Sequence, residues 1–312
     1  MGSAPLLNLD PEDNINLDKL INKISLQQCC AFIGAGLSIC AGYPSWDGVI
    51  KHFEHKIQGL NIDPISLPVD SNWNQIEFFR KVLGEEKYKD EIVYLFGQDG
   101  KHQFLPAHHK LCQIPFPSLI TTNFDYCLEN AAMSCQKNIT VQYYPELNFS
   151  LFRESQIYHI HGVIPPLQPQ ALIGSIILSE SDYSAAYQQG TGLPRFLASV
   201  ADFYSIVFLG YSLGDNDLIK VIHATQLELE QRSDFESQRK LGKRKQPPHF
   251  IIMHKDAKVN RDKLSHLGLL PIRYGGEKVR HADLQILLDY IQSRTTQIKY
   301  PEPTIYRDIF EE

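Results

Sequence analysis

The chain has 312 residues, a hydrophobic content of 43% and a formal net charge of −6. This size suits one large globular domain or two modest ones. The acidic balance argues against direct nucleic-acid binding, a basic run at 239–245 being interpreted as a solvated loop, and no apolar run reaches the roughly 18 residues that span a bilayer.

The cysteines and the N-terminus indicate a cytoplasmic protein. The N-terminus lacks a charged segment followed by an apolar core, so no secretory signal is predicted. No C-x-x-C pair occurs, which argues against a zinc module built on two such pairs. Several cysteines lie in apolar runs, where a free thiol behaves as a small hydrophobe, and this suits a reducing compartment. The six are Cys29, Cys30, Cys40, Cys112, Cys127 and Cys135.

The first quarter of the chain predicts an arm, a helix and a strand. Residues 1–14 are polar and contain proline, which predicts a loose N-terminal arm. Apolar side chains at helical spacing predict a helix over 15–25, and the apolar run at 28–33 predicts a buried strand. A glycine turn follows the strand, and a helix is expected at 46–57.

A small helical insertion is predicted at about 60–112. It opens with a loop at 60–72, which contains Pro64 and Pro68 and has no periodicity. Helical patterns at 74–97 and 108–112 complete it.

The remainder alternates short apolar strands with helices, which predicts an α/β fold with a Rossmann-like parallel sheet and helices on both faces. One domain is expected over 15–300, followed by a C-terminal tail at 301–312. Strands are predicted at 118–122, 157–162, 205–209, 250–253 and 271–274, helices at 126–133, 183–189, 194–202, from 216 and at 282–295, and a charged linker at 232–248.

Polar motifs follow four of the predicted strands, at 34–38, 121–125, 159–162 and 210–215. Ligands of open parallel sheets bind beyond the carboxyl ends of the strands. We therefore expect these four segments to converge on one crevice.

Each motif also has a purely structural interpretation. Gly34-Ala35-Gly36 suits a phosphate-binding turn or a tight corner, and it is not a complete G-x-G-x-x-G. Asn123 and Asp125 follow a strand, where helix capping accounts for one of the two. The segment containing Gly210, Tyr211, Ser212 and Asp215 suits either a site or a capped loop. Pro44 indicates a second fixed turn, and Trp46 either covers the crevice or packs in the core.

His159 and His161 stand two residues apart on a predicted strand, so both are expected on one face. No third metal ligand is evident, so no metal is predicted. A base and a packing residue suit the pair better, with His161 as the base because it precedes Gly162 at the strand end.

Taken together, these residues resemble the sirtuin superfamily over about 28–225. The matching patterns are G-A-G-x-S-x-x-x-G-x-P from Gly34 to Pro44, T-x-N-x-D from Thr121 to Asp125, H-G at His161 and G-x-S from Gly210. T-T-N-F-D, I-H-G and G-Y-S-x-x-D are typical of the sirtuin-like domain of prokaryotic antiphage defence proteins. The absent zinc module and the segment Ser45-Trp46-Asp47 depart from the deacylase pattern.

The resemblance implies an NAD⁺ hydrolase that releases nicotinamide and ADP-ribose without a metal. By resemblance, Gly34, Ala35, Gly36 and Ser38 hold the pyrophosphate and adjoining ribose, while Asn123 positions water beside the nicotinamide ribose. Asp125 holds the nicotinamide end or organises Asn123, and His161 is the general base. Gly210, Tyr211 and Ser212 line the adenosine side, with Asp215 beside them.

The family also suggests how such an activity is regulated. A homo-oligomer is expected, with activation by assembly or by a defence partner in trans such as a regulatory ATPase. A fragment of a longer effector is the alternative. A nucleotide-binding scaffold with little turnover, and a protein deacylase, remain the rival functions.

Overall fold

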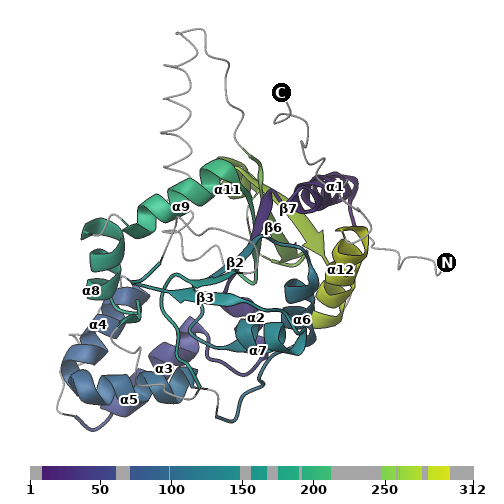
Figure 1. The fold of residues 1–312 in the computed structure, drawn as a ribbon. Coiled ribbons are helices and arrows are strands. Elements are labelled where there is room, and N and C mark those ends of the chain that lie inside the picture. Colours follow the sequence, from purple (N-terminus) through teal and green to yellow (C-terminus); the bar gives the residue numbers. More distant parts are fainter. Residues whose placement is uncertain are drawn as a thin grey trace, which may run out of the picture.

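The computed structural model describes residues 9–60, 71–97, 99–147, 156–166, 175–189, 192–211, 247–257, 259, 261–275 and 280–295. Within these ranges, seven strands form one sheet in the order β3-β4-β2-β1-β5-β6-β7, and every neighbouring pair is parallel (Figure 1). The predicted α/β fold with a parallel sheet is therefore confirmed. The strands are β1 (Cys29–Ile33), β2 (Ser118–Thr121), β3 (Thr140–Tyr143), β4 (Gln156–His159), β5 (Ser205–Leu209), β6 (His249–His254) and β7 (Leu269–Tyr274).

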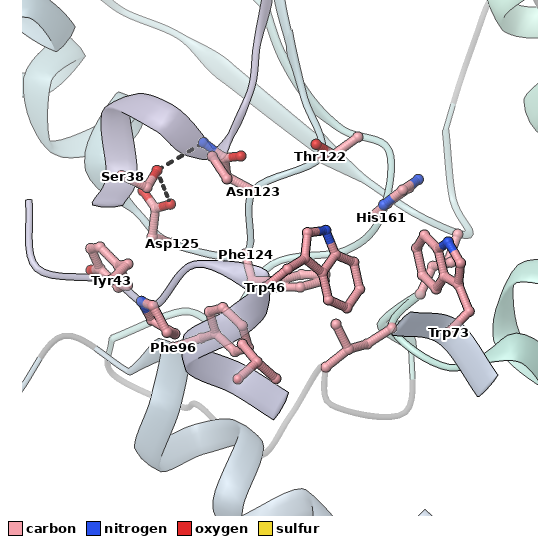
Figure 2. A pocket seen from close by; sticks show the side chains of 15 residues that line it. Ser38, Tyr43, Trp46, Trp73, Phe96, Thr122, Asn123, Phe124, Asp125 and His161 are labelled. Atoms are coloured by element: carbon pink, nitrogen blue, oxygen red, sulfur yellow. Dashed lines mark hydrogen bonds between the residues drawn. The ribbon is translucent and has the colours of Figure 1, made fainter. Parts of the chain in front are cut away.

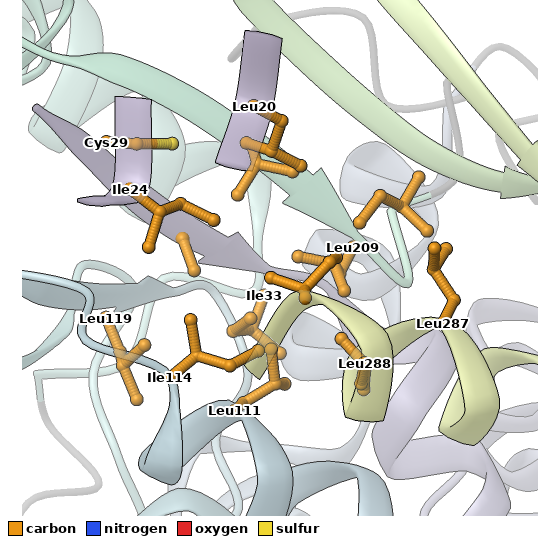
Figure 3. Packing of buried hydrophobic residues seen from close by; sticks show 14 of the residues in the cluster. Leu20, Ile24, Cys29, Ile33, Leu111, Ile114, Leu119, Leu209, Leu287 and Leu288 are labelled. Atoms are coloured by element: carbon orange, nitrogen blue, oxygen red, sulfur yellow. The ribbon is translucent and has the colours of Figure 1, made fainter. Parts of the chain in front are cut away.

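Both faces of the sheet are covered by helices, as the continuous apolar strands predict. Side chains alternate between the faces along each strand. Ile33 belongs to a core shared with α1 (Pro11–Ser25), α6 (Pro106–Gln113), α7 (Cys127–Ser134) and α12 (Arg280–Thr295), part of which Figure 3 shows. Its neighbour Phe32 belongs to the opposite core, which includes α9 (Gly192–Phe203) and α11 (Arg261–His266).

A third apolar cluster joins α3 (Trp46–Ile57), α4 (Asn72–Leu83) and α5 (Glu85–Phe96). Its centre is the stack of Phe53 on Phe79, whose ring centroids are 5.6 Å apart. The single helix predicted at 74–97 is two helices, because Gly84 lies between them with φ +80°. Helix α4 contacts the short helix α8 (Glu180–Tyr183), which lies beside it in Figure 1 and is followed directly by the π-helix η4 (Ser184–Gln189).

The predicted arm at 1–14 is wrong from Pro11 onward, because α1 begins there. Proline suits the first helical position, and Glu12 and Asp13 favour the positive end of the helix dipole. Asp13 is only 1% exposed and accepts a 3.1 Å hydrogen bond from Nε of Arg273 in β7. The first turn of α1 is thus attached to the edge of the sheet.

Three elements were not predicted, namely α2 (Ala35–Cys40), the edge strand β3 and α11. The tail at 301–312, the helix expected from Asn216 and nearly all of the charged linker lie outside the described residues. Among the helices in the described ranges, none is long and apolar enough to cross a membrane.

Candidate active site

The motifs after β1, β2 and β4 line one pocket at the carboxyl edge of the sheet (Figure 2). These strands are neighbours and run in the same direction, so their ends meet, as predicted. Of the predicted site residues, the pocket is lined by Ala35, Ser38, Pro44, Trp46, Asn123, Asp125 and His161.

The glycine turn packs against the end of β5, which lies on the other side of β1. The N–H of Gly34 donates to Leu209 O at 2.8 Å, and the N–H of Gly36 donates to Gly210 O at 2.7 Å. A Cβ on Gly34 would lie 2.6 Å from Gly210 O, and one on Gly36 would lie 2.8 Å from it. Close backbone packing thus accounts for both glycines, and their N–H groups already have protein acceptors.

Asn123 is held at four points. Its backbone N–H donates to Oγ1 of Thr121 at 3.0 Å, and the Thr121 hydroxyl in turn donates to Ile33 O in β1 at 2.8 Å. The side-chain nitrogen Nδ2 donates to Ser38 Oγ at 2.8 Å and to Gly34 O at 3.1 Å. The backbone carbonyl accepts a bond from Nδ1 of His159 at 2.8 Å.

One atom of Asn123 is left without a protein partner. Its side-chain oxygen Oδ1 is buried and makes no hydrogen bond. Figure 2 shows this oxygen turned away from Ser38. Because an unpartnered buried acceptor costs about 1–3 kcal/mol, Oδ1 is the natural point of attachment for a donor on a ligand or a water molecule.

Asp125 is buried, and both of its oxygens accept hydrogen bonds within the protein. The Ser38 hydroxyl donates to Oδ2 at 2.6 Å, and the backbone N–H of Cys127 donates to Oδ1 at 3.0 Å. Ser38 therefore links Asn123 to Asp125, since it accepts from the first and donates to the second. This arrangement suits Asp125 as the residue that organises Asn123, and its second oxygen binds the N–H of Cys127, the first residue of α7.

His161 lines the same pocket and is 6% exposed. Burial lowers the pKa of His161 to about 3, so the imidazole is neutral at neutral pH and able to accept a proton. Its Nε2 lies 2.8 Å from the hydroxyl of Tyr187 in η4. The ring of Trp73 in α4 lies edge-on to it, with centroids 6.1 Å apart.

His159 does not share these surroundings. The expectation of one common strand face is wrong, because β4 ends at His159 and His161 lies in the turn that Gly162 closes with φ +90°. Nε2 of His159 lies 2.6 Å from Oε1 of Glu129 in α7. Burial opposes protonation of His159, but the charge and hydrogen bond of Glu129 outweigh it, and the pKa of His159 is raised.

The pocket wall is largely aromatic. Trp46, from the start of α3, packs edge-on against Trp73 with ring centroids 5.1 Å apart. Tyr43, Phe96 and Phe124 complete the aromatic lining. Such a wall excludes water and offers flat, apolar surfaces.

The remaining predicted residues have different surroundings. Tyr211 packs edge-on against Phe32, with centroids 5.8 Å apart. Gly36 and Gly210 line a neighbouring pocket between α2, α6 and α12. Ser212 and Asp215 lie outside the described residues.

Several residues at the site were not predicted. Thr122 and Trp73 line the pocket, Tyr187 contacts His161, and Glu129 contacts His159. Thr122 stands next to Asn123 and was recognisable from the motif. The other three come from segments that only the fold brings to the site. In the described ranges, no group of three or more His, Cys, Asp or Glu residues is arranged to hold a metal ion.

Comparison with known proteins identifies a family that shares these motifs. The family model of the SIR2-like domain matches residues 117–272, which is half of the chain. This range includes the segment from Asn123 to Asp125 and the pair His159 and His161.

Individual relatives are distant. The chain is 22% identical over 306 residues to the NAD(+) hydrolase ThsA of Cytobacillus dafuensis, covering 96% of this chain and 55% of that protein. It is 25% identical over 193 residues to the Defense-associated sirtuin 2 of Bacillus subtilis, covering 60% of this chain and 18% of that protein. The chain thus spans about half or less of the length of these curated relatives.

A solved structure described as a crystal structure of a SIR2 homolog–NAD complex covers 89% of this chain and 94% of its own, with a TM-score of 0.47 and 15% identity. The assignment rests instead on the matched family model, on the parallel sheet and on the motifs gathered at its carboxyl edge. The chain belongs to the family of proteins with a SIR2-like domain.

Proposed function

We propose that this chain is an NAD⁺ hydrolase. The observation that carries the proposal is the pairing, in one aromatic pocket, of the unpartnered Oδ1 of Asn123 with the neutral imidazole of His161. The first suits a donor such as water or a ribose hydroxyl. The second is neutral and can accept a hydrogen bond or a proton from that donor, although burial makes it a weak base. Relatives named as NAD(+) hydrolases support the same activity.

The proposed reaction adds water to C1′ of the nicotinamide ribose. The bond between C1′ and the nicotinamide nitrogen breaks, and its electron pair neutralises the cationic ring, so the leaving group needs no acid. The new bond joins C1′ to the water oxygen, and the proton released passes to His161 or to solvent. Asn123 orients the water, and the aromatic wall keeps bulk solvent from the oxocarbenium-like state.

The remaining roles are proposed from the motifs and, for the described residues, from their contacts. Ser38 and Asp125 would hold the Asn123 amide in place, and Ala35 would face the pyrophosphate at the start of α2. Gly34 and Gly36 would shape that turn, while Gly210, Tyr211, Ser212 and Asp215 would lie toward the adenosine. Pro44 and Trp46 would cover the nicotinamide end.

The test is nicotinamide release from NAD⁺ by the purified chain, measured over a range of protein concentrations. His161→Gln and Asn123→Ala are expected to lose at least a hundredfold in kcat. The matched control is His55→Gln, which changes an exposed histidine of α3. Wild-type rates in a folded Asn123→Ala variant would contradict the mechanism.

A role in antiphage defence, by depletion of NAD⁺, accompanies this proposal and rests on the relative named as a defence-associated sirtuin. Activation would come from assembly of a homo-oligomer or from a partner in trans. A steep dependence of specific activity on protein concentration is the result expected for assembly.

A catalytically weak nucleotide-binding scaffold is the alternative. Calorimetry separates the two, because a scaffold binds NAD⁺ without releasing nicotinamide at any protein concentration. An acyl-lysine peptide assay tests the deacylase alternative.

A further inference from the structure

Behind the pocket lies a buried pair, His159 and Glu129, neither of which is among the residues that line it. His159 is 1% exposed and Glu129 is 4% exposed. The pair is joined by the 2.6 Å contact between Nε2 and Oε1. Charged or polar groups this deeply buried are costly unless they are well paired.

The other ring nitrogen of His159 contacts the main chain of Asn123. Its Nδ1 lies 2.8 Å from the backbone carbonyl oxygen of Asn123. A carbonyl only accepts hydrogen bonds, so Nδ1 must carry a proton. The imidazole therefore holds the main chain of Asn123 in a single orientation, directly beside the amide that faces the pocket.

Glu129 holds the second nitrogen of the ring. An ionised carboxylate beside a neutral imidazole would attract the single proton to Nε2, so a proton on Nδ1 requires a further proton on the His159–Glu129 pair. With Glu129 at Nε2, either the ring is protonated on both nitrogens or a protonated carboxyl donates to Nε2. Both arrangements leave the proton on Nδ1, and the raised pKa of His159 favours the first.

We propose that His159 and Glu129 are positioning residues for the hydrolysis proposed above, with His159 anchoring the backbone of Asn123 and Glu129 holding the ring of His159 with Nδ1 protonated. This inference rests on the proposed function. The two histidines thus have different roles: His161 contacts the substrate, and His159 holds the backbone of Asn123.

The decisive variant replaces the pair by apolar side chains of similar volume, His159→Phe with Glu129→Leu. Replacing a buried ion pair in this way is often neutral for stability, whereas removing one partner leaves a buried charge unpaired. A positioning role predicts a melting temperature near that of the wild type, a Kd for NAD⁺ within about twofold, and a kcat at least about tenfold lower. A merely structural role predicts that kcat returns with stability, and that result would overturn the proposal.

The chain offers a matched control. His52 and Glu91 form a second pair, with Nε2 2.7 Å from Oε2, between α3 and α5. The variant His52→Phe with Glu91→Leu loses a less buried His–Glu contact and the ion pair of Glu91 with Lys56, without touching Asn123, and its kcat is expected to equal that of the wild type.

A milder variant tests the role of Glu129 and serves if the double variant does not fold. In Glu129→Gln the amide N–H₂ donates to Nε2, which leaves the proton on Nδ1. Its kcat is expected within about threefold of wild type. A loss of more than tenfold with unchanged NAD⁺ affinity would overturn the role given to Glu129.

Hydrogen exchange separates this inference from the proposed function. If the wild type releases no more nicotinamide than His161→Gln, the hydrolase proposal fails, and the backbone amides of 122–125 then become the readout. Faster exchange there in the His159→Phe/Glu129→Leu variant, with no change in the His52→Phe/Glu91→Leu control, supports the anchoring of Asn123. Equal exchange in all three proteins overturns it.

Discussion

The hydroxyl oxygen of Tyr187 lies 2.8 Å from Nε2 of His161, and this bond joins the proposed base to the π-helix η4. Insertions that produce a π-turn are frequent at functional sites. Tyr187 also stacks on Tyr183, with centroids 4.5 Å apart, and Tyr183 packs against Trp73. The orientation of the imidazole is therefore supported by α4, α8 and η4 together.

Replacing Tyr187 by Phe is expected to lower kcat for NAD⁺ hydrolysis roughly tenfold, because the imidazole loses the bond that fixes its ring and tautomer. The stacked ring remains, so the melting temperature should change little. Steady-state kinetics of Tyr187→Phe beside Tyr183→Phe measure the difference. An increase in kcat would show instead that Tyr187 blocks the base.

Replacing Ser38 by Ala removes the hydroxyl that joins Asn123 to Asp125. Two buried groups each lose a hydrogen-bond partner, which costs about 1–3 kcal/mol in the free energy of unfolding. The Asn123 amide keeps only its bond to Gly34 O, so kcat is expected to fall about tenfold or more. Urea unfolding and kinetics measure both effects, and Ser199→Ala on the exposed face of α9 is the control. Unchanged kinetics would show that the link is dispensable.

Gly210→Ala tests the close packing between β1 and β5. Gly210 has φ +63°, and an added Cβ would lie 3.0 Å from Leu37 N and 3.1 Å from Gly34 O. Strain and overpacking together are expected to lower the free energy of unfolding by about 3 kcal/mol. Gly100→Ala shares the positive φ but meets nothing within 4 Å, so it isolates the strain at about 1 kcal/mol. Equal losses in the two variants would contradict the packing argument.

Stability is expected to fall as the pH drops from 6.5 toward the folded-state pKa values of about 4 and 3 for two buried histidines. Burial lowers the pKa of His161 to about 3 and that of His249 to about 4, so both bind protons more readily in the unfolded chain than in the folded one. Their contribution is complete above the unfolded pKa of 6.5 and is lost as the pH falls. The raised pKa of His159 acts in the opposite direction, since its contribution is lost as the pH rises through that pKa.

Melting temperatures across this range measure the effect. His249→Gln keeps an acceptor for the N–H of Ile206, which now bonds Nδ1 at 3.1 Å. The free energy of unfolding of this variant should change with pH less steeply than that of the wild type, by up to about 1.4 kcal/mol per pH unit. An unchanged slope would show that His249 does not stay neutral in the folded chain.

Most of the sheet was predictable because its strands are buried on both faces and are therefore apolar without interruption. The strand expected at 205–209 is β5, whose five residues are all buried. The edge strand β3 was not predicted, because only Gln142 is buried among Thr140–Tyr143 and no apolar run marks the strand. The six-residue helix α2 escaped because two glycines beside an alanine resemble a turn.

Some residues of the candidate site were likewise predictable from the sequence and others were not. Asn123, Asp125 and His161 were found because they directly follow strands, and the direction of the sheet brings strand ends together. Trp73 and Glu129 were not found, because Trp73 comes from a helix in another part of the chain and Glu129 resembles an ordinary polar helix residue. Its 4% exposure is a consequence of packing that a single sequence does not reveal.

The aromatic wall gives the protein a built-in optical probe. The chain contains two tryptophans, Trp46 and Trp73, and both line the pocket 5.1 Å apart. Ultraviolet excitation at the red edge of the protein band thus selects emission from this one place, without a label or an engineered residue. Quenching of this tryptophan emission, or a shift of its wavelength, can be compared after adding NAD⁺, nicotinamide or ADP-ribose. The comparison would report which part of the dinucleotide enters beside His161.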